Sequence, residues 1–328
     1  AAGDKIYFAR GTTCNGQLAP QGSGTSSSVI TIDAYGTGAL PIINGGSSND
    51  ATVLLNNQSY WTIADLEVIG GIHYGVLVSG KVDNQPVSGI TLKNLDVHGA
   101  TGTAQTITDS GEVYLSPNGK GQTLNDILVD GVTAHDSQVS EGIAVYGGGA
   151  WVGYPSQPLG SNVAVQNSTV YNVYGNGILI TTLKNGMVKD SVVHNSGNCP
   201  KCQGTPSGLW EWYCQTCTIQ NNESYANQTV VGTNDGSDFD IDYYNNGNTV
   251  QYNYGHDSWG YCVAVFGASG GTDDNNIFRY NICSNNAQNA NEAGQGDVFM
   301  STWDNGYING IQVYNNTFYW NPVVQAQL

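Results

Sequence analysis

The sequence predicts a single all-β domain over residues 1–328, built as a β-solenoid. The first observation is a repeat, in which a short unit such as KNLDVH (93–98), KDSVVH (189–194) or QNNESY (220–225) recurs at spacings of 23 to 37 residues. The second observation is that the units hold short β runs and turns without the 3.6-residue periodicity of a helix, which favours a β-solenoid over a helical repeat. The third observation is composition, because 44 glycines and only 11% charged residues favour backbone-rich β structure.

The short β runs can be followed from the N-terminus. Residues 4–11 (DKIYFARG), 29–32 and 41–43 are strand-like runs separated by Gly/Ser turns. Each later unit follows a short strand such as 90–92, and most are followed by a Gly- or Asn-containing turn and another strand, such as 177–180. Such rungs would stack ~4.8 Å apart through parallel pairing. We expect an apolar column facing inward and Asn or Asp recurring at the turns.

The charge balance restricts the partners. A net charge of −17 with 9 basic residues argues against binding to nucleic acid or to an anionic membrane. No apolar run approaches the ~20 residues of a membrane span. The sequence predicts neither an oligomeric state nor the identity of a sugar ligand.

Several features predict a secreted, extracellular protein. The chain has 7 cysteines and an acidic balance, as many secreted proteins do. No signal peptide is visible, so we expect a mature form. Five Asn-x-Ser/Thr sequons are candidate glycosylation sites, with about even odds of carrying glycans; they are Asn57, Asn167, Asn222, Asn227 and Asn315.

Two strand-like stretches carry acidic residues where strands rarely do. They are residues 209–213 (LWEWY) and 238–242 (DFDID). A strand has a period of two, so Asp238, Asp240 and Asp242 are expected to share one face. Like charges along one face cost stability, and a chain that accepts this cost beside a Trp-rich strand is usually building a site.

A candidate active site follows from stacking these two stretches. If Gly208 and Ser237 begin equivalent strands, Glu211 lies beside Asp240 on the outer face, about one rung away. Facing carboxyls push their pKa values apart, and glycoside hydrolysis needs one protonated acid and one ionised partner. The predicted catalytic residues are Glu211, Asp238 and Asp240. The predicted substrate-binding residues are Tyr213, Asp242, Tyr243, His256, Trp259 and Tyr261.

Two other interpretations of the acidic strand stay open. The carboxylates could be solvated groups on an acidic protein. They could also bind calcium, because Asp238, Asp240 and Asp242 superficially follow an Asp-x-Asp-x-Asp pattern. That pattern lacks the glycine and the later glutamate of a calcium loop, and strand alternation explains the spacing. No metal ligands or cofactors are therefore predicted, with calcium as the alternative.

The histidines occupy one column of the repeat. His98, His135, His194 and His256 end their units, where other units have tyrosine. A position shared by His and Tyr is structural by default. His256 is the exception that we treat as functional, because it lies beside Asp257 and follows the acidic strand.

Cysteine spacing allows two interpretations. Cys199 and Cys202, like Cys214 and Cys217, have the paired spacing of a zinc site. In a secreted solenoid, two disulfides that hold the loop beside Glu211 are the preferred interpretation, with their connectivity open. Cys262 and Cys283 are expected either to pair or to be buried thiols. The remaining Cys14 could pair with a segment that precedes this chain.

The chain resembles the right-handed parallel β-helix superfamily, which holds pectate lyases, polygalacturonases and other polysaccharide-active enzymes. The opening GDKIYFARGTTCNGQLAP (3–20) and ITIDAYGTGALPIING (30–45) are similar to its first rungs, and the repeated units to later ones. The resemblance implies a right-handed parallel β-helix over the whole chain. In relatives another strand usually precedes the GDKI-like stretch, so segments are expected to be missing at the N-terminus and, after residues 322–324, at the C-terminus.

One segment resembles polygalacturonases more specifically. Residues 234–241 (NDGSDFDI) are similar to their NTDGFDI stretch, which implies Asp235 or Asp238 as a candidate acid. Their paired aspartates are replaced here by Gly260-Tyr261, and no Gly-His-Gly or Arg-Ile-Lys motif follows. The resemblance therefore supports the fold more than this particular reaction.

The predicted function is a secreted glycoside hydrolase that cleaves a polysaccharide or oligosaccharide. The first alternative is a calcium-dependent polysaccharide lyase on the same acidic face. A lyase needs a base to remove the α-proton, and no Lys or Arg lies between residues 208 and 266. The second alternative is a non-catalytic glycan-binding or structural solenoid. The concentration of carboxylates in two adjacent rungs favours an enzyme.

Overall fold

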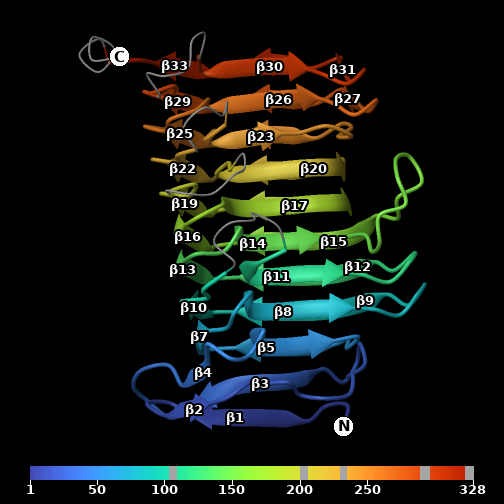
Figure 1. Cartoon of the computed structure of the whole chain (residues 1–328), viewed down its shortest axis with the longest axis vertical. Helices are drawn as coiled ribbons and strands as arrows, with labels where there is room; N and C mark the ends of the chain where they lie inside the picture. The colour runs from blue at the N-terminus through green and yellow to red at the C-terminus, as the bar shows by residue number, and fades with distance from the viewer. Residues whose placement is uncertain (103–108, 200–205, 230–234, 289–295, 322–328) are drawn as a thin grey trace.

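The protein is a right-handed parallel β-helix, as the sequence and its resemblance predicted (Figure 1). The computed structural model describes residues 1–102, 109–199, 206–229, 235–288 and 296–321. Each rung contributes strands to three parallel ladders, which we number I, II and III in the order in which the chain visits them. Figure 1 shows the rungs stacked from β1 at one end to β33 at the other.

The strands have the following bounds. Ladder I consists of β1 (Lys5–Ala9), β3 (Ile30–Tyr35), β6 (Trp61–Ala64), β9 (Val87–Lys93), β12 (Leu124–Asp130), β15 (Gly160–Gln166), β18 (Met187–Lys189), β21 (Thr218–Gln220), β24 (Thr249–Gln251), β28 (Ile277–Arg279) and β32 (Gln312–Tyr314). Ladder II consists of β2 (Thr13–Asn15), β4 (Ile42–Gly46), β7 (Glu67–Gly70), β10 (Asp96–His98), β13 (Thr133–Ser137), β16 (Thr169–Val173), β19 (Val192–His194), β22 (Glu223–Tyr225), β25 (Tyr254–His256), β29 (Ile282–Ser284) and β33 (Thr317–Tyr319). Ladder III consists of β5 (Ala51–Asn56), β8 (Tyr74–Gly80), β11 (Gly111–Pro117), β14 (Glu141–Tyr146), β17 (Asn176–Lys184), β20 (Leu209–Gln215), β23 (Phe239–Ile241), β26 (Val263–Gly267) and β30 (Val298–Thr302). A short extra pair joins β27 (Thr272–Asp274) to β31 (Tyr307–Asn309).

The repeated sequence unit marks the turn from ladder I into ladder II. Its second residue adopts the left-handed conformation, for example Asn94 (φ 49°), Asn167 (φ 50°) and Asn221 (φ 56°). Asn and Asp tolerate this conformation better than other side chains, which explains why the unit repeats them. The last residue of the unit then stacks in ladder II, where His98 pairs with His135.

The core is a set of apolar columns inside the solenoid. In ladder III one column runs through Leu55, Val78, Leu115, Val145 and Ile180, all 0% exposed. Further residues of ladders I and II close the interior from the other sides, including Ile32, Ile63 and Val97. Because each rung alone cannot bury its inward face, neighbouring rungs stabilise one another.

Buried asparagines replace apolar residues at several corners. The Oδ1 atoms of Asn222, Asn253 and Asn281 each accept a hydrogen bond from a backbone N–H of the preceding rung, at 2.9 to 3.0 Å. Asn222 is 3% exposed and Asn227 is 0% exposed. The prediction that these two sequons are candidate glycosylation sites is therefore wrong, because a glycan would have no room there. For Asn57, Asn167 and Asn315, glycosylation stays a prediction.

The cysteine predictions are corrected in one part. Cys262 and Cys283 form a disulfide, one of the two expected outcomes, and Cys199 is disulfide-bonded. Cys214 and Cys217 are free, so the prediction of a disulfide for them is wrong. Both face the apolar interior, where the Cys217 sulfur accepts the Gly186 N–H at 3.3 Å. Cys14 is free and exposed, and Cys202 lies outside the described residues.

Among the described residues, no helix is long and apolar enough to cross a membrane.

Candidate active site

The acidic strand β23 presents one carboxylate to the outer face of ladder III. Phe239 and Ile241 are 0% exposed and belong to the core, so Asp240 between them points outward. Asp240 pairs with Trp210 of β20 on one side and with Ala264 of β26 on the other. The alternation that the sequence predicted for residues 239–241 is thus realised in the fold.

The predicted register between β20 and β23 is wrong by one residue. Leu209 pairs with Phe239, and Glu211 pairs with Ile241 and with Ile180. Glu211 therefore occupies the inward column and is 0% exposed. It cannot face Asp240 on the outer surface, so the prediction that Glu211 is a catalytic residue is wrong. A one-residue change of register moves a side chain to the opposite face of a strand.

Asp238 is also turned away from the outer face. Asp238 precedes β23 and lies in one column with Gly208 of the preceding rung. The Gly208 N–H donates a hydrogen bond to the carbonyl oxygen of Ser237. Asp238 Oδ1 accepts hydrogen bonds from Ser258 (2.6 Å) and Asn227 (3.1 Å) at a buried corner. A Cβ on Gly255 would lie 2.7 Å from Asp238 Oδ2, so the glycine makes the space that this carboxyl occupies. The predictions that Asp238 shares a face with Asp240 and acts in catalysis are therefore wrong.

Three other carboxyl groups interact on the outer side of ladder III. Asp240 is 4% exposed, and its pKa is raised well above the usual range by burial and then by the charges of Asp242 and Asp235. Burial raises the pKa of Asp242 to about 8, with a further contribution from Asp235. Burial raises the pKa of Asp235 to about 7. The three groups repel one another when charged, so the protonation of each depends on the other two.

Hydrogen bonds position these carboxyls. The Ser207 hydroxyl donates to Asp240 Oδ2 at 3.0 Å and contacts the Ser237 hydroxyl at 2.8 Å. The backbone N–H of Tyr243 donates to Asp242 Oδ1 at 2.9 Å. Among the described residues, Asp240 Oδ1 is buried without a hydrogen-bond partner. A buried acceptor without a partner is costly, which is expected where a substrate completes the site.

The same polar column continues toward the N-terminal rungs. Asn176 Oδ1 accepts the N–H of Ser207 at 2.7 Å, and the Asn176 side-chain amide donates to Glu141 at 3.2 Å. Burial raises the pKa of Glu141 to about 8, and the charge of Asp109 adds to this effect. The outer face of ladder III is therefore acidic over several rungs.

An aromatic wall stands beside the three aspartates. Trp212 stacks on Trp151 with ring centroids 5.3 Å apart, and Tyr243 contacts both Trp212 (5.9 Å) and Trp303 (6.2 Å) edge to face. Trp151 and Trp303 are 50% and 42% exposed, so their rings are accessible. Exposed aromatic rings next to carboxyls are suited to stack on sugars.

Trp151 is a candidate binding residue that our sequence reasoning missed. It belongs to the extruded loop between β14 and β15, which also brings Tyr154 onto Tyr244 at 4.8 Å. In the sequence, the only indication of this role is that the loop contains glycine, proline and two large aromatic residues. The repeat does not indicate which rung such a loop covers. The wall therefore depends on a contact between residues about sixty positions apart.

The predicted aromatic residues have different environments. Tyr243 is half-buried in the wall and Trp259 is half-buried in the turn between β25 and β26. Tyr213 and Tyr261 are each 1% exposed. Tyr261 stacks on Phe299 at 4.3 Å, and Tyr213 packs against Trp151, Tyr154 and Tyr244. The prediction that Tyr213 and Tyr261 stack on sugars is wrong, because their rings already pack within the protein.

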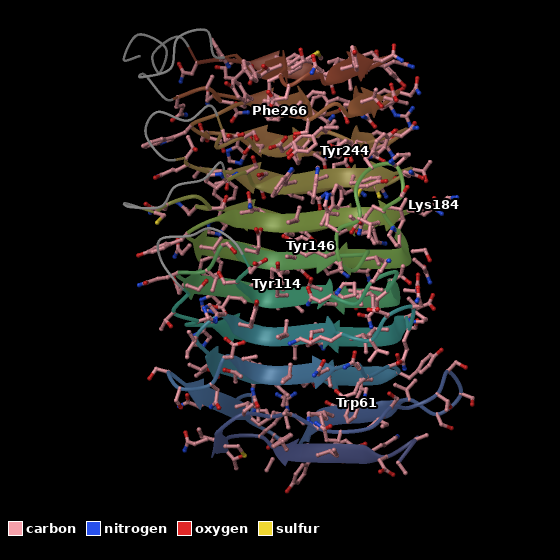
Figure 2. The ribbon with its side chains drawn as sticks, turned by 45° about the vertical axis from the view of Figure 1, so that its right-hand side comes forward. Trp61, Tyr114, Tyr146, Lys184, Tyr244 and Phe266 are labelled. Atoms are coloured by element: carbon pink, nitrogen blue, oxygen red, sulfur yellow. A yellow bond between two sulfur atoms is a disulfide. The ribbon has the colours of Figure 1, made fainter. Side chains whose placement is uncertain are left out.

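The wall continues along the outer face of ladder III. Figure 2 shows Tyr114, Tyr146, Tyr244 and Phe266 on this face. Tyr114 contacts both Tyr146 (5.3 Å) and Tyr74 (5.2 Å). Near Tyr74 and Tyr114, a cavity of about 350 Å³ opens over β5, β8 and β11 and includes Asp109 in its lining. This surface has room for sugar units beyond the three aspartates.

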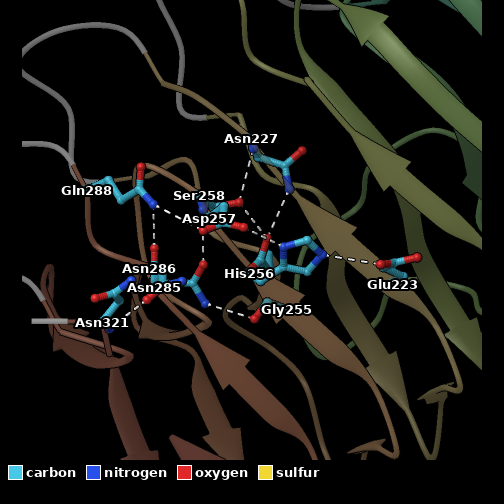
Figure 3. A network of polar contacts seen from close by, with 11 residues as sticks. Glu223, Asn227, Gly255, His256, Asp257, Ser258, Asn285, Asn286, Gln288 and Asn321 are labelled. Atoms are coloured by element: carbon cyan, nitrogen blue, oxygen red, sulfur yellow. Dashed lines mark hydrogen bonds and ion pairs between the residues drawn. The ribbon is translucent and has the colours of Figure 1, made fainter. Parts of the chain in front are cut away.

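His256 belongs to a different face of the solenoid. It lies in β25 of ladder II, where its ring stacks on Tyr225 at 4.8 Å. Its Nε2 contacts Glu223 at 3.2 Å and its Nδ1 contacts Asp257 at 2.8 Å (Figure 3). The prediction that His256 binds substrate beside the acidic strand is therefore wrong. His256 follows the acidic strand β23 in the sequence, but it lies on ladder II, whereas Asp240 faces outward from ladder III, because the chain turns a corner between them.

Comparison with known proteins finds similar sequences and structures. No family model matches the chain. Lacto-N-biosidase from Bifidobacterium longum subsp. longum is 24% identical over 329 residues, covering 74% of this chain and 20% of that protein. A crystal structure of lacto-N-biosidase of glycoside hydrolase family 136 from Eubacterium ramulus matches with a TM-score of 0.73 at 19% identity, covering 98% of this chain and 62% of that one. An alginate lyase from a Paenibacillus species matches with a TM-score of 0.58 at 16% identity, covering 92% of each chain.

These likenesses confirm the parallel β-helix fold. The chain spans about a fifth of the Bifidobacterium protein and less than two thirds of the Eubacterium structure. The activity, substrate and partners of the whole protein are therefore treated below as proposals.

Proposed function

We propose that the protein is a glycoside hydrolase that acts on an oligosaccharide at the outer face of ladder III. The observation that supports this most is the coupled set of Asp235, Asp240 and Asp242 beside exposed tryptophans. The similarity to lacto-N-biosidases supports the same reaction class. It also makes oligosaccharides that carry a lacto-N-biose unit the first substrates to test.

The reaction needs a carboxylic acid and a carboxylate at the same time. Asp235 and Asp242, with pKa values raised to about 7 and about 8, supply one protonated and one ionised group near neutral pH. The protonated group would donate to the departing glycosidic oxygen, and the ionised group would attack the anomeric carbon or activate water. The charges of Asp242 and Asp235, together with burial, hold the pKa of Asp240 well above its usual range.

The wall and the acidic face support a neutral glycan rather than a strongly anionic one. Like charges repel, and the outer face of ladder III carries several carboxyls. Trp151 and Trp303 would bind sugar rings by stacking, without needing charge. We propose no cofactor, and secretion follows as a proposal from the cysteine content and the polysaccharide-active relatives.

A calcium-dependent lyase is the alternative with a structural neighbour, the alginate lyase. Among the described residues, no group of three close ligand atoms includes Asp235, Asp240 or Asp242. This arrangement supports acid–base chemistry better than a calcium cage, which takes 6–8 oxygen ligands.

Product analysis tests the proposal. The protein would be incubated with lacto-N-biose-containing oligosaccharides and with a panel of neutral and anionic polysaccharides, with and without a chelator. New reducing ends that persist with the chelator would support the hydrolase. Unsaturated products that absorb in the ultraviolet and vanish with the chelator would show the lyase. Binding without any product would show the non-catalytic alternative.

A further inference from the structure

The outer face of ladder II carries a continuous stack of imidazole and phenol rings. Neighbouring rings along it lie 4.8 to 5.1 Å apart; they belong to His98, His135, Tyr171, His194, Tyr225 and His256. Histidine and tyrosine alternate along most of this stack. At one end, however, His98 and His135 follow each other directly on β10 and β13.

Carboxylates surround this histidine pair. Asp96 Oδ1 lies 2.9 Å from His135 Nε2, and Glu67 Oε1 lies 3.3 Å from His98 Nε2. One ligand atom from each of Asp96, His98 and His135 lies within 4.8 Å of the other two. On the other side of the His135 ring, Asp136 Oδ2 contacts Nδ1 at 2.8 Å.

The contacts of His135 favour a bound positive charge. Both of its ring nitrogens face a carboxylate oxygen, but a neutral imidazole has only one N–H to donate. If Nδ1 donates to Asp136, Nε2 presents a lone pair toward Asp96. A positive charge resolves this conflict, supplied either by a second ring proton or by a metal ion held between Nε2 and the Asp96 carboxylate. A carboxylate on the far nitrogen is also the usual support for a metal-binding histidine.

We propose that Asp96, His98 and His135 form a Zn²⁺ site, with Glu67 or water in the fourth position. Zinc takes four ligands at about 2.0–2.2 Å, so its ligand atoms lie about 3.3 Å from one another. The separation of Asp96 and His135 already falls near this value, and the remaining ligand atoms need to approach by about 1.5 Å at most. Such an ion would join β10 to β13, and through Glu67 to β7, and so hold three successive rungs together.

The same stack contains a natural control. His256 has the same kind of carboxylate contacts, with Glu223 at Nε2 and Asp257 at Nδ1 (Figure 3). The ring that precedes it is Tyr225 rather than histidine. His256 therefore has the carboxylates of the proposed site without its second imidazole, and we expect it not to hold zinc tightly.

Zinc titration of tag-free protein tests the site. The protein would carry Cys14→Ser, because Cys14 is free and exposed. ZnCl₂ binding would be measured by competition with a chromophoric chelator, alongside histidine ring NMR signals and the melting temperature. We expect one zinc equivalent that shifts the signals of His98 and His135 and raises the melting temperature.

Three substitutions make the test specific. His98→Tyr copies the Tyr225–His256 arrangement and should therefore fold. It should weaken zinc binding by at least about 10-fold, because losing even a group that only supports a metal ligand lowers the affinity by that much. Tyr225→His should add a second zinc equivalent at Glu223 and His256. His256→Gln should leave the first equivalent unchanged. Absence of zinc binding in the parent protein, or full binding in folded His98→Tyr, would overturn the proposal.

Discussion

Asp240 of β23 lies directly opposite Trp210 of β20, while Glu211 lies opposite Ile241 inside the solenoid. This register separates two acids that are adjacent in a simple alignment of the two stretches. Asp240 joins Asp242 and Asp235 on the outer face of ladder III, and Glu211 is fully buried in the inward column.

Replacing the outer acids should remove activity. In Asp235→Asn and Asp242→Asn, the loss of a group that transfers a proton or bonds the sugar should lower kcat by about 10²- to 10⁴-fold. Glu211→Gln is the matched control, because its side chain does not reach the outer face and should keep most of the activity. Reducing-end assays on folded variants check this expectation. Inactive Glu211→Gln together with active aspartate variants would contradict the site.

The activity should be greatest near neutral pH. The pKa of Asp242 is raised to about 8, so a protonated acid is lost as the pH rises through this value. The pKa of Asp235 is raised to about 7, so the ionised partner is lost as the pH falls below it. Profiles of kcat/KM against pH for the intact protein measure both limbs. A maximum near pH 4 to 5, where ordinary carboxyls titrate at about 4, would contradict the raised values.

Glu211 should make folding stability fall as the pH rises. Burial raises its pKa to about 8 in the folded protein, whereas the unfolded chain has its usual value of 4.5. The folded state therefore binds the proton more tightly, and stability is lost between these two values as the pH increases. Glu211→Gln removes this loss and should be more stable at pH 8 by on the order of 1 to 4 kcal/mol.

Urea unfolding of the parent protein and Glu211→Gln at pH 5 and pH 8 measures this difference. The gain in stability should shrink toward pH 5, since a protonated glutamic acid resembles glutamine. Equal gains at both values would show that burial does not hold the Glu211 pKa high.

Trp151 should contribute to substrate binding. Its ring is 50% exposed and stacks on Trp212 beside the aspartates. Trp151→Ala should raise KM by about 3- to 10-fold, the range expected for one aromatic contact, with a smaller change in kcat. Tyr252→Ala is the control, because Tyr252 is 55% exposed but stacks on Tyr280 next to ladder I. Equal effects of the two changes would count against an aromatic wall at the site.

The architecture was predictable because each rung repeats a local rule. The left-handed turn at Asn94 and Asn167, followed by an alternating strand, can be read from a few consecutive residues. Stacking such rungs buries their inward faces, so the parallel β-helix follows from the repeat. The shared column of His98, His135 and His256 was predictable for the same reason.

The site was less predictable because it depends on register and on loops. Rungs differ in length, and a shift of one residue decided that Glu211 is buried and that Asp240 is outside. The position of Asp238 was mispredicted because its carboxyl fits the buried corner only where ladder II has a residue without a side chain, Gly255. Trp151 was missed because its loop crosses to a rung that local sequence does not specify.

By itself, the sequence determined the solenoid and the stretch that carries the acids, since both depend on local periodicity. Only the tertiary structure decided which acids meet. Asp235, Asp240 and Asp242 come together on the outer face of ladder III, whereas Glu211 and Asp238 are buried inside the solenoid, because the pairing of rungs and the corners between ladders set the direction of each side chain. Those directions depend on contacts between residues about thirty positions apart, which a local pattern does not contain.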